Sequence, residues 1–179
     1  MKSYAGIGSR STPFDIQLVM RDLAQALEND YILRSGGADG ADDAFFEGVT
    51  PERRKTRTQI FLPSKCFRRH EAPLRGCIDA TRLPAWPRAL ETVDKYHPMP
   101  TRLAPFARRL MARNAMQVLG PDLDDPVSFV VCWTPGGEVV GGTSQAIRIA
   151  LDHGIPIRNL GREGDLQAAL RFLDSLRVA

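Results

Sequence analysis

The sequence predicts an α/β protein with an open, mostly parallel sheet that has helices on both faces. Two observations predict this class. Short apolar runs alternate with segments in which apolar residues recur at helical spacing, as in strand–helix–strand units. Three of the apolar runs also end in loops rich in glycine and hydroxyl residues, and each loop leads into a predicted helix.

The first fifty residues alternate between strands and helices. The first helix opens at Thr12-Pro13, where we expect the Thr12 hydroxyl to cap the helix and Pro13 to occupy its first position. The second strand enters a loop with three glycines within five residues, which is typical of a tight turn or an anion site. The predicted order is strand 2–7, helix 13–28, strand 31–33 and helix 41–47.

Beyond residue 50 the alternation continues, with one long interruption at 64–100. This basic excursion contains five prolines, and we interpret it as an irregular, partly helical segment of the kind that forms a binding lid or an interface. We expect Leu103, Phe106 and Leu110 on the inner side of the helix that follows. No domain boundary is visible, so residues 1–179 are predicted to form a single domain. The predicted order is strand 58–63, helix 101–119, strand 128–133, helix 145–153, strand 155–157 and helix 165–176.

Composition limits the class of protein. Among the 179 residues, 43% are hydrophobic and 25% are charged, which is ordinary for a globular protein. No apolar run is long enough to cross a membrane, and the N-terminus is interpreted as a strand and not as a signal peptide. The three cysteines and three histidines lack metal-ligand spacing. We therefore expect a cytoplasmic protein without a metal site, a cofactor or a membrane anchor.

Charge is unevenly distributed along the chain. Residues 51–114 contain 15 Lys or Arg and 5 Asp or Glu, a net charge of +10, whereas the rest of the chain has a net charge of −7. Two interpretations stay open. The arginines form a solvated helical surface, or they form a patch that attracts the phosphates of a nucleotide or of a nucleic acid.

The glycine-rich loops are the candidate ligand site. In a parallel sheet, loops that follow strands gather at the carboxyl ends of the strands, where ligands bind. We expect the backbone N–H groups of Gly141, Gly142, Thr143 and Ser144 to hold a phosphate, assisted by the Thr143 hydroxyl. The loop of Gly8, Ser9 and Arg10 lies at the end of the first strand. Its Arg10 is a candidate for a bidentate phosphate contact, and a surface ion pair is the alternative.

Several carboxylates follow the second strand. Asp42 and Asp43 suit the first turn of a helix, where negative charge complements the helix dipole. Asp39 lies inside the glycine loop, and Glu47 lies further along the helix. If the protein is an enzyme, Asp39 or Glu47 is the candidate for acid–base catalysis.

Four segments resemble the motif series of the SLOG superfamily: Tyr4–Arg10, Ser35–Asp42, Arg113-Asn114 and Gly141–Thr143. This superfamily includes the Rossmann-like domain of DNA-processing protein A, the lonely-guy phosphoribohydrolases and the molybdenum-cofactor carrier proteins. The resemblance covers most of residues 1–160. The segment Ser35–Asp42 and the Arg113-Asn114 pair are most similar to DNA-processing protein A.

The resemblance implies a Rossmann-like fold, a dimer and a phosphate site for a nucleotide or a nucleic acid. In this arrangement Arg113 closes over the ligand. Lonely-guy enzymes place a catalytic glutamate two residues after their Gly-Thr pair, where this chain has Gln145, and a neutral amide cannot act as that carboxylate. The residues that the resemblance assigns to the site are Ser35, Gly36, Gly37, Arg113, Asn114, Gly142 and Thr143.

Three functions follow from these observations. The first is binding of a nucleotide or a nucleotide-derived ligand, with or without hydrolysis or transfer at an N-glycosidic or phosphate bond. The alternative is a recombination mediator that binds single-stranded DNA and resembles DNA-processing protein A. A third interpretation is an interaction module whose pocket has lost its ligand.

Overall fold

The computed structural model describes residues 1–65, 67 and 76–177. Its centre is a six-stranded sheet in which every strand pair is parallel. The α/β, Rossmann-like fold class is therefore confirmed, and the sheet is wholly parallel. In spatial order the strands are β4 (Cys77–Asp79), β3 (Thr58–Leu62), β2 (Tyr31–Ser35), β1 (Lys2–Gly8), β5 (Val130–Trp133) and β6 (Ile157–Asn159).

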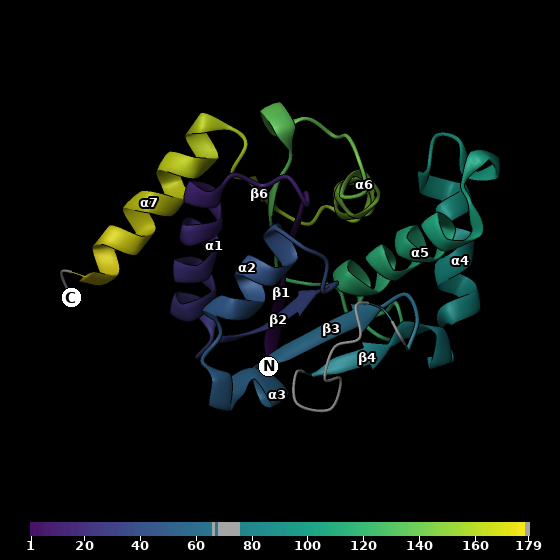
Figure 1. Cartoon of the computed structure of the whole chain (residues 1–179), viewed down its shortest axis with the longest axis horizontal. Helices are drawn as coiled ribbons and strands as arrows, with labels where there is room; N and C mark the ends of the chain where they lie inside the picture. Colours follow the sequence, from purple (N-terminus) through teal and green to yellow (C-terminus); the bar gives the residue numbers. More distant parts are fainter. Residues whose placement is uncertain (66, 68–75, 178–179) are drawn as a thin grey trace.

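The helices form a layer on each face of the sheet (Figure 1). Helices α1, α2 and α7 pack on the face that carries Tyr4 and Leu33, whereas α4, α5 and α6 pack on the face of Ala5 and Ile7. The described helices are α1 (Phe14–Leu27), α2 (Ala41–Gly48), α3 (Arg54–Arg57), α4 (Trp86–Tyr96), α5 (Pro105–Leu119), α6 (Ser144–Asp152) and α7 (Glu163–Arg177).

The strand order shows where the sheet changes its direction of winding. From β1 the chain builds the sheet outward through β2, β3 and β4, and it then crosses to the other side of β1 to form β5 and β6. The direction of winding thus changes between β1 and β5. In open parallel sheets a crevice forms at the carboxyl ends of the strands at this switch point. We call the border of the sheet where the strands end the carboxyl edge, and the border where they begin the amino edge. These borders differ from the edge strands β4 and β6.

Several predicted boundaries were wrong for identifiable reasons. Pro13 is the N-cap of α1, and the Thr12 hydroxyl donates to Ser9 O at 2.7 Å instead of capping the helix. Helix α5 begins at Pro105, and Phe106 is 47% exposed because the buried part of this helix is its second half. The last strand begins one residue after Pro156, which lacks an N–H.

The basic excursion at 64–100 is more regular than the sequence indicated. It contains the edge strand β4 and the helix α4, whose Ala89 and Val93 are buried. A three-residue strand is too short for an alternating pattern to be recognised, and the prolines obscure the start of the helix. Residue 66 and residues 68–75 of this segment lie outside the described residues.

A substitution at Gly48 tests the packing between α1 and α2. A Cβ at Gly48 would overlap the backbone carbonyl of Arg21, which cannot rotate away. We predict that Gly48→Ala lowers the free energy of unfolding by about 2 kcal/mol, measured by urea denaturation. The matched control is Gly164→Ala in α7, where a Cβ would meet no atom within 4 Å. The control variant should be as stable as the wild type or more stable by up to about 1 kcal/mol. Equal stabilities for the two variants would contradict this packing.

Candidate functional site

Three loops meet at the carboxyl edge. Ser9 N donates to Trp133 O at 3.1 Å, which joins the loop after β1 to the end of β5. Ala41 N donates to Ser9 O at 3.3 Å, which joins the same loop to the start of α2. A Cβ at Gly8 would lie 2.6 Å from Ala41 Cβ and 2.9 Å from Trp133 O, so these segments approach each other as closely as only glycine permits.

The loop between β2 and α2 depends on two glycines with left-handed backbone. Gly37 and Gly40 have φ values of +64° and +80°. A Cβ at Gly40 would lie 2.7 Å from the carbonyl oxygens of both Ser9 and Arg10. The loop therefore turns sharply from the sheet into α2 and holds its backbone against the loop after β1. Ser35, at the end of β2, is buried and donates its hydroxyl to Gly6 O at 2.7 Å, so it anchors the strand.

A buried ion pair lies beneath this loop. Asp42 Oδ2 accepts from Ala38 N at 3.2 Å and lies 3.5 Å from Arg113 NH1. Both side chains are almost fully buried. The guanidinium lies directly under Gly36, where a Cβ would overlap Arg113 NH1. Gly36 is thus required for packing over the arginine, and Arg113 supports the loop from below.

The pair continues into a chain of buried amides. With its amide oriented to satisfy its neighbours, Gln117 accepts from Gly36 N at 2.9 Å and from Arg113 NH1 at 2.7 Å, and it donates to Asn114 Oδ1 at 2.9 Å. Asn114 Nδ2 in turn donates to Gly142 O at 2.7 Å. Residues of α5 therefore connect the loop after β2 with the loop before α6. We call Asp42, Arg113, Gln117 and Asn114 the buried polar chain.

Burial dominates the electrostatics of the ion pair. It raises the pKa of the Asp42 carboxyl, and the nearby Arg113 and the Ala38 N–H oppose the rise. Burial also lowers the pKa of the Arg113 guanidinium, against the attraction of Asp42. Arg113 Nε lies buried without a hydrogen-bond partner among the described residues. Each charge is therefore costly without the other.

The position of Arg113 differs from its expected place over the ligand. Its guanidinium is buried beneath Gly36 and paired with Asp42, so it supports the loop from below. The sequence interpretation also assigned Asp42 to the helix dipole and missed its pairing with Arg113. The position of Asp42 was informative, although its partner was not visible. An acidic residue in the first helical turn after a glycine loop lies close to the residues that pack beneath that loop.

The loop before α6 presents its backbone to solvent. Gly141 and Gly142 are exposed, and Gly141 has a φ of +67°. The hydroxyl of Ser144 donates to Gly141 O at 2.7 Å and accepts from Arg148 NH1 at 3.0 Å. Thr143 is largely buried and precedes the first turn of α6. Of the four backbone N–H groups predicted to hold a phosphate, that of Ser144 donates to Gly141 O at 3.2 Å. The donors that this loop offers to an anion are therefore those that precede Ser144.

Basic residues lie at both the amino and the carboxyl edge of the sheet. Arg53, Arg54 and Arg57 precede β3 and therefore lie at the amino edge. At the carboxyl edge, Arg109 lies one turn before Arg113 on α5 and is exposed. Arg10, also exposed, follows β1 at the same edge. Neither Arg10 nor Arg109 has a hydrogen bond or ion pair from its side chain to the part of the chain that the structure describes.

The other candidate catalytic residues are separated in space. Asp39 is exposed in the loop at the crevice. Glu47 forms an ion pair with Arg21 and lines a different surface hollow, between α1 and α2. Gln145 is fully buried, and its Nε2 donates to Thr92 O of α4 at 3.2 Å. The structure therefore brings Asp39 to the crevice, and it brings neither Glu47 nor the side chain of Gln145 there.

Two further observations concern metal binding and membrane spanning. In the described ranges, no three His, Cys, Asp or Glu side chains come together in an arrangement that could bind a metal ion. None of the helices described here has the length and apolar character needed to cross a membrane.

The ion pair beneath the loop can be tested by charge removal. We predict that Asp42→Asn lowers the free energy of unfolding by about 3 kcal/mol, because it leaves the Arg113 charge buried and unpaired. The neighbouring Asp43→Asn, at a half-buried position, is the control and should change stability by less than about 1 kcal/mol. A double-mutant cycle with Arg113→Met should give a coupling of at least about 1 kcal/mol. Additive effects of the two substitutions would exclude the pairing.

Comparison with known proteins identifies one structural relative. No protein-family model matches the sequence, and no curated protein matches it significantly. The structure is similar to that of DNA processing protein A from Helicobacter pylori, with a TM-score of 0.60 and 17% sequence identity. The similarity covers 97% of this chain and 80% of that protein, whose structure was described for its unique mode of binding single-stranded DNA. At this identity the similarity shows that the two proteins share a fold.

Proposed function

We propose that this protein binds single-stranded DNA at the carboxyl edge, through the sugar–phosphate backbone. The observation that carries the proposal is the meeting of three glycine-containing loops at the switch point of the sheet, in a fold shared with a protein that binds single-stranded DNA. The fold alone does not determine function, so the argument rests on what these loops and the side chains around them can bind.

The loops offer backbone donors to phosphates. Loop 36–40 leads into the N-terminus of α2, and loop 141–143 leads into the N-terminus of α6. The helix dipole is positive at both N-termini and attracts anions there. At the start of α2, Ala41 N and Asp43 N donate to Ser9 O and Ala38 O, so the dipole is the main attraction at this loop. The buried polar chain holds the two loops at a fixed separation. The two loops therefore present one connected backbone surface to the phosphates of a strand.

Exposed side chains at the same edge complete the proposed interface. Arg10 and Arg109 supply positive charge for further phosphates. Phe106, in the first turn of α5, is 47% exposed and its ring centre lies 6.2 Å from that of Phe67. Unpaired bases stack on exposed aromatic rings that lie near basic residues, and Phe106 lies one turn before the exposed Arg109.

A nucleotide or nucleotide-derived ligand is the second candidate, because the same loops would hold its phosphates. Asp39 then faces the sugar and either accepts a hydrogen bond from a hydroxyl group or acts as a base in a hydrolase or transferase reaction. Two hollows, one beside α6 and β6 and one between α1 and α2, are lined by other residues than Asp39, Gly36 or Gly142. Enclosed pockets are the usual sites of small molecules, which makes the nucleotide the second candidate.

Binding of fluorescein-labelled oligothymidylate, measured by fluorescence anisotropy, tests the proposal. We predict that affinity falls steeply with salt and that Arg10→Ala and Arg109→Ala each weaken binding about tenfold, or ~1.4 kcal/mol. Each substitution should also reduce the slope of log Kd against log salt concentration by roughly 0.7, the value for one lost phosphate contact with a single strand.

Lys55→Ala provides the matched control. Lys55 is exposed and, like Arg109, belongs to the basic region 51–114, but it lies in α3 at the amino edge. Its removal should leave the affinity and the salt slope unchanged. Equal losses from the Lys55 and Arg10 variants would indicate nonspecific attraction and would exclude the proposed interface. Tight binding of a mononucleotide with a shallow salt dependence would favour the second candidate. The dimer implied by the resemblance stays a prediction, which light scattering measures.

A further inference from the structure

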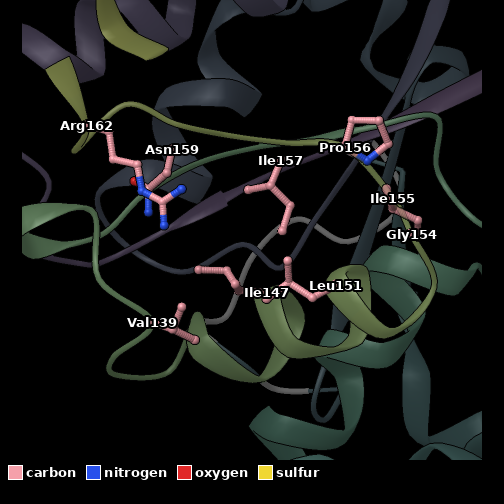
Figure 2. Close-up of a pocket in the computed structure, with 9 residues that line it drawn as sticks. All are labelled: Val139, Ile147, Leu151, Gly154, Ile155, Pro156, Ile157, Asn159 and Arg162. Carbon is pink, nitrogen blue, oxygen red and sulfur yellow. The ribbon is translucent and has the colours of Figure 1, made fainter. Parts of the chain in front are cut away.

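An apolar hollow of about 380 Å³ lies between α6 and the edge strand β6, with Val139 of the loop before α6 in its lining (Figure 2). Its walls are the outer side of α6 and the segment that leads into β6. Ligand sites in proteins have volumes of this size and are mostly apolar, with a few polar groups that fix the ligand. The apolar side chains that line the hollow are Val139, Ile147, Leu151, Ile155, Pro156 and Ile157.

The topology leaves this hollow uncovered. After β6 the chain turns into α7, and α7 packs against α1 on the opposite face of the sheet (Figure 1). Helix α6 is therefore the last described helix on its own face, and the edge strand extends beyond it. Leu151 is 61% exposed as a result. A Cβ at Gly154 would meet no atom within 4 Å, so the far end of the hollow is also open.

One end of the hollow carries a positive charge that is held in place. Figure 2 shows Arg162 and Asn159 at the end opposite Gly154 and Pro156. The aliphatic part of Arg162 packs against Gly137, where a Cβ would overlap Arg162 Cγ, and Arg162 Nε donates to Gly137 O at 3.1 Å. The guanidinium is thus oriented, and its terminal nitrogens make no hydrogen bond to the described residues.

The acids that follow Arg162 in the sequence have other partners. Glu163 accepts from Gln167 Nε2 at 2.9 Å. Asp165 pairs with Arg158 at 3.3 Å and accepts from Asn159 N at 3.0 Å. These carboxylates therefore leave the Arg162 charge available to a ligand.

The side-chain amide of Asn159 forms hydrogen bonds to the loops on either side of it. Its Oδ1 accepts from Thr134 N at 3.2 Å and from Gly161 N at 3.1 Å, and its Nδ2 donates to Thr134 Oγ1 at 2.7 Å. Asn159 thus supports the end of the hollow from a buried position. Arg162 is the charged group of a lining whose other side chains, apart from Asn159, are apolar.

We propose that this hollow binds a small amphipathic anion. The apolar body of the ligand packs on Ile147, Leu151 and Ile157, and its carboxylate or phosphate group binds the terminal nitrogens of Arg162. A neutral ligand of the same shape gains only the apolar contacts. The site is separate from the proposed DNA interface, so each proposal can fail without the other.

Octanoate is the probe, and octanol is its uncharged counterpart. We expect octanoate to shift the backbone amide resonances of residues 154–157 and 162 in ¹H–¹⁵N spectra of the full chain, with a Kd at least fivefold lower than that of octanol. Arg162→Gln should weaken octanoate at least fivefold and leave octanol unchanged. Arg171→Gln is the matched control, because Arg171 is an exposed arginine of α7 that does not line the hollow.

Leu151→Ser tests the apolar wall at a position that is exposed and therefore tolerant of substitution. It should weaken octanoate and octanol together by about threefold or more, whereas Leu176→Ser, at an exposed leucine of α7, should change neither. Equal binding of the two probes, or equal effects of the Arg162 and Arg171 variants, would overturn the proposal. A change from oligomer to monomer in Leu151→Ser, seen by light scattering, would also overturn it, since the hollow would then be an interface between copies.

Discussion

The buried pairing of Asp42 with Arg113 is the constraint on which the crevice depends. It places a charge from α2 against a charge from α5, directly beneath the loop that contains Gly36. Neither charge is stable in this environment without the other. Because Asp42 also accepts the Ala38 N–H, the pair fixes the loop above it as well as the two helices below it.

The pair also determines how a ligand can be held. Gln117 and Asn114 extend it to Gly142, so loop 36–40 and loop 141–143 are positioned by the same helix. With Arg113 used as a support, the proposed interface takes its positive charge from exposed residues around the loops, such as Arg10 and Arg109. A backbone surface bordered by exposed cations suits the phosphates of a flexible polymer.

The alternation of apolar runs predicted the sheet and the three loops that meet at its edge, because periodicity and glycine placement are local properties. The partner of Asp42 was not predictable in this way, since it lies 71 residues away in the sequence. Likewise, the helical spacing of Phe106 and Leu110 could not show that only the second half of α5 is buried. The strand β4 pairs at an edge and is too short to have a pattern of its own.

Hydrogen–deuterium exchange with and without oligothymidylate tests the central claim most directly. The account predicts that DNA slows exchange in both loop 36–40 and loop 141–143, because the buried polar chain holds them as one surface. In Asp42→Asn the basal exchange of both loops should rise, and the DNA-induced protection of both should fall. Protection confined to the amino edge, around α3, would contradict the account, and so would protection that survives in full when the ion pair is removed.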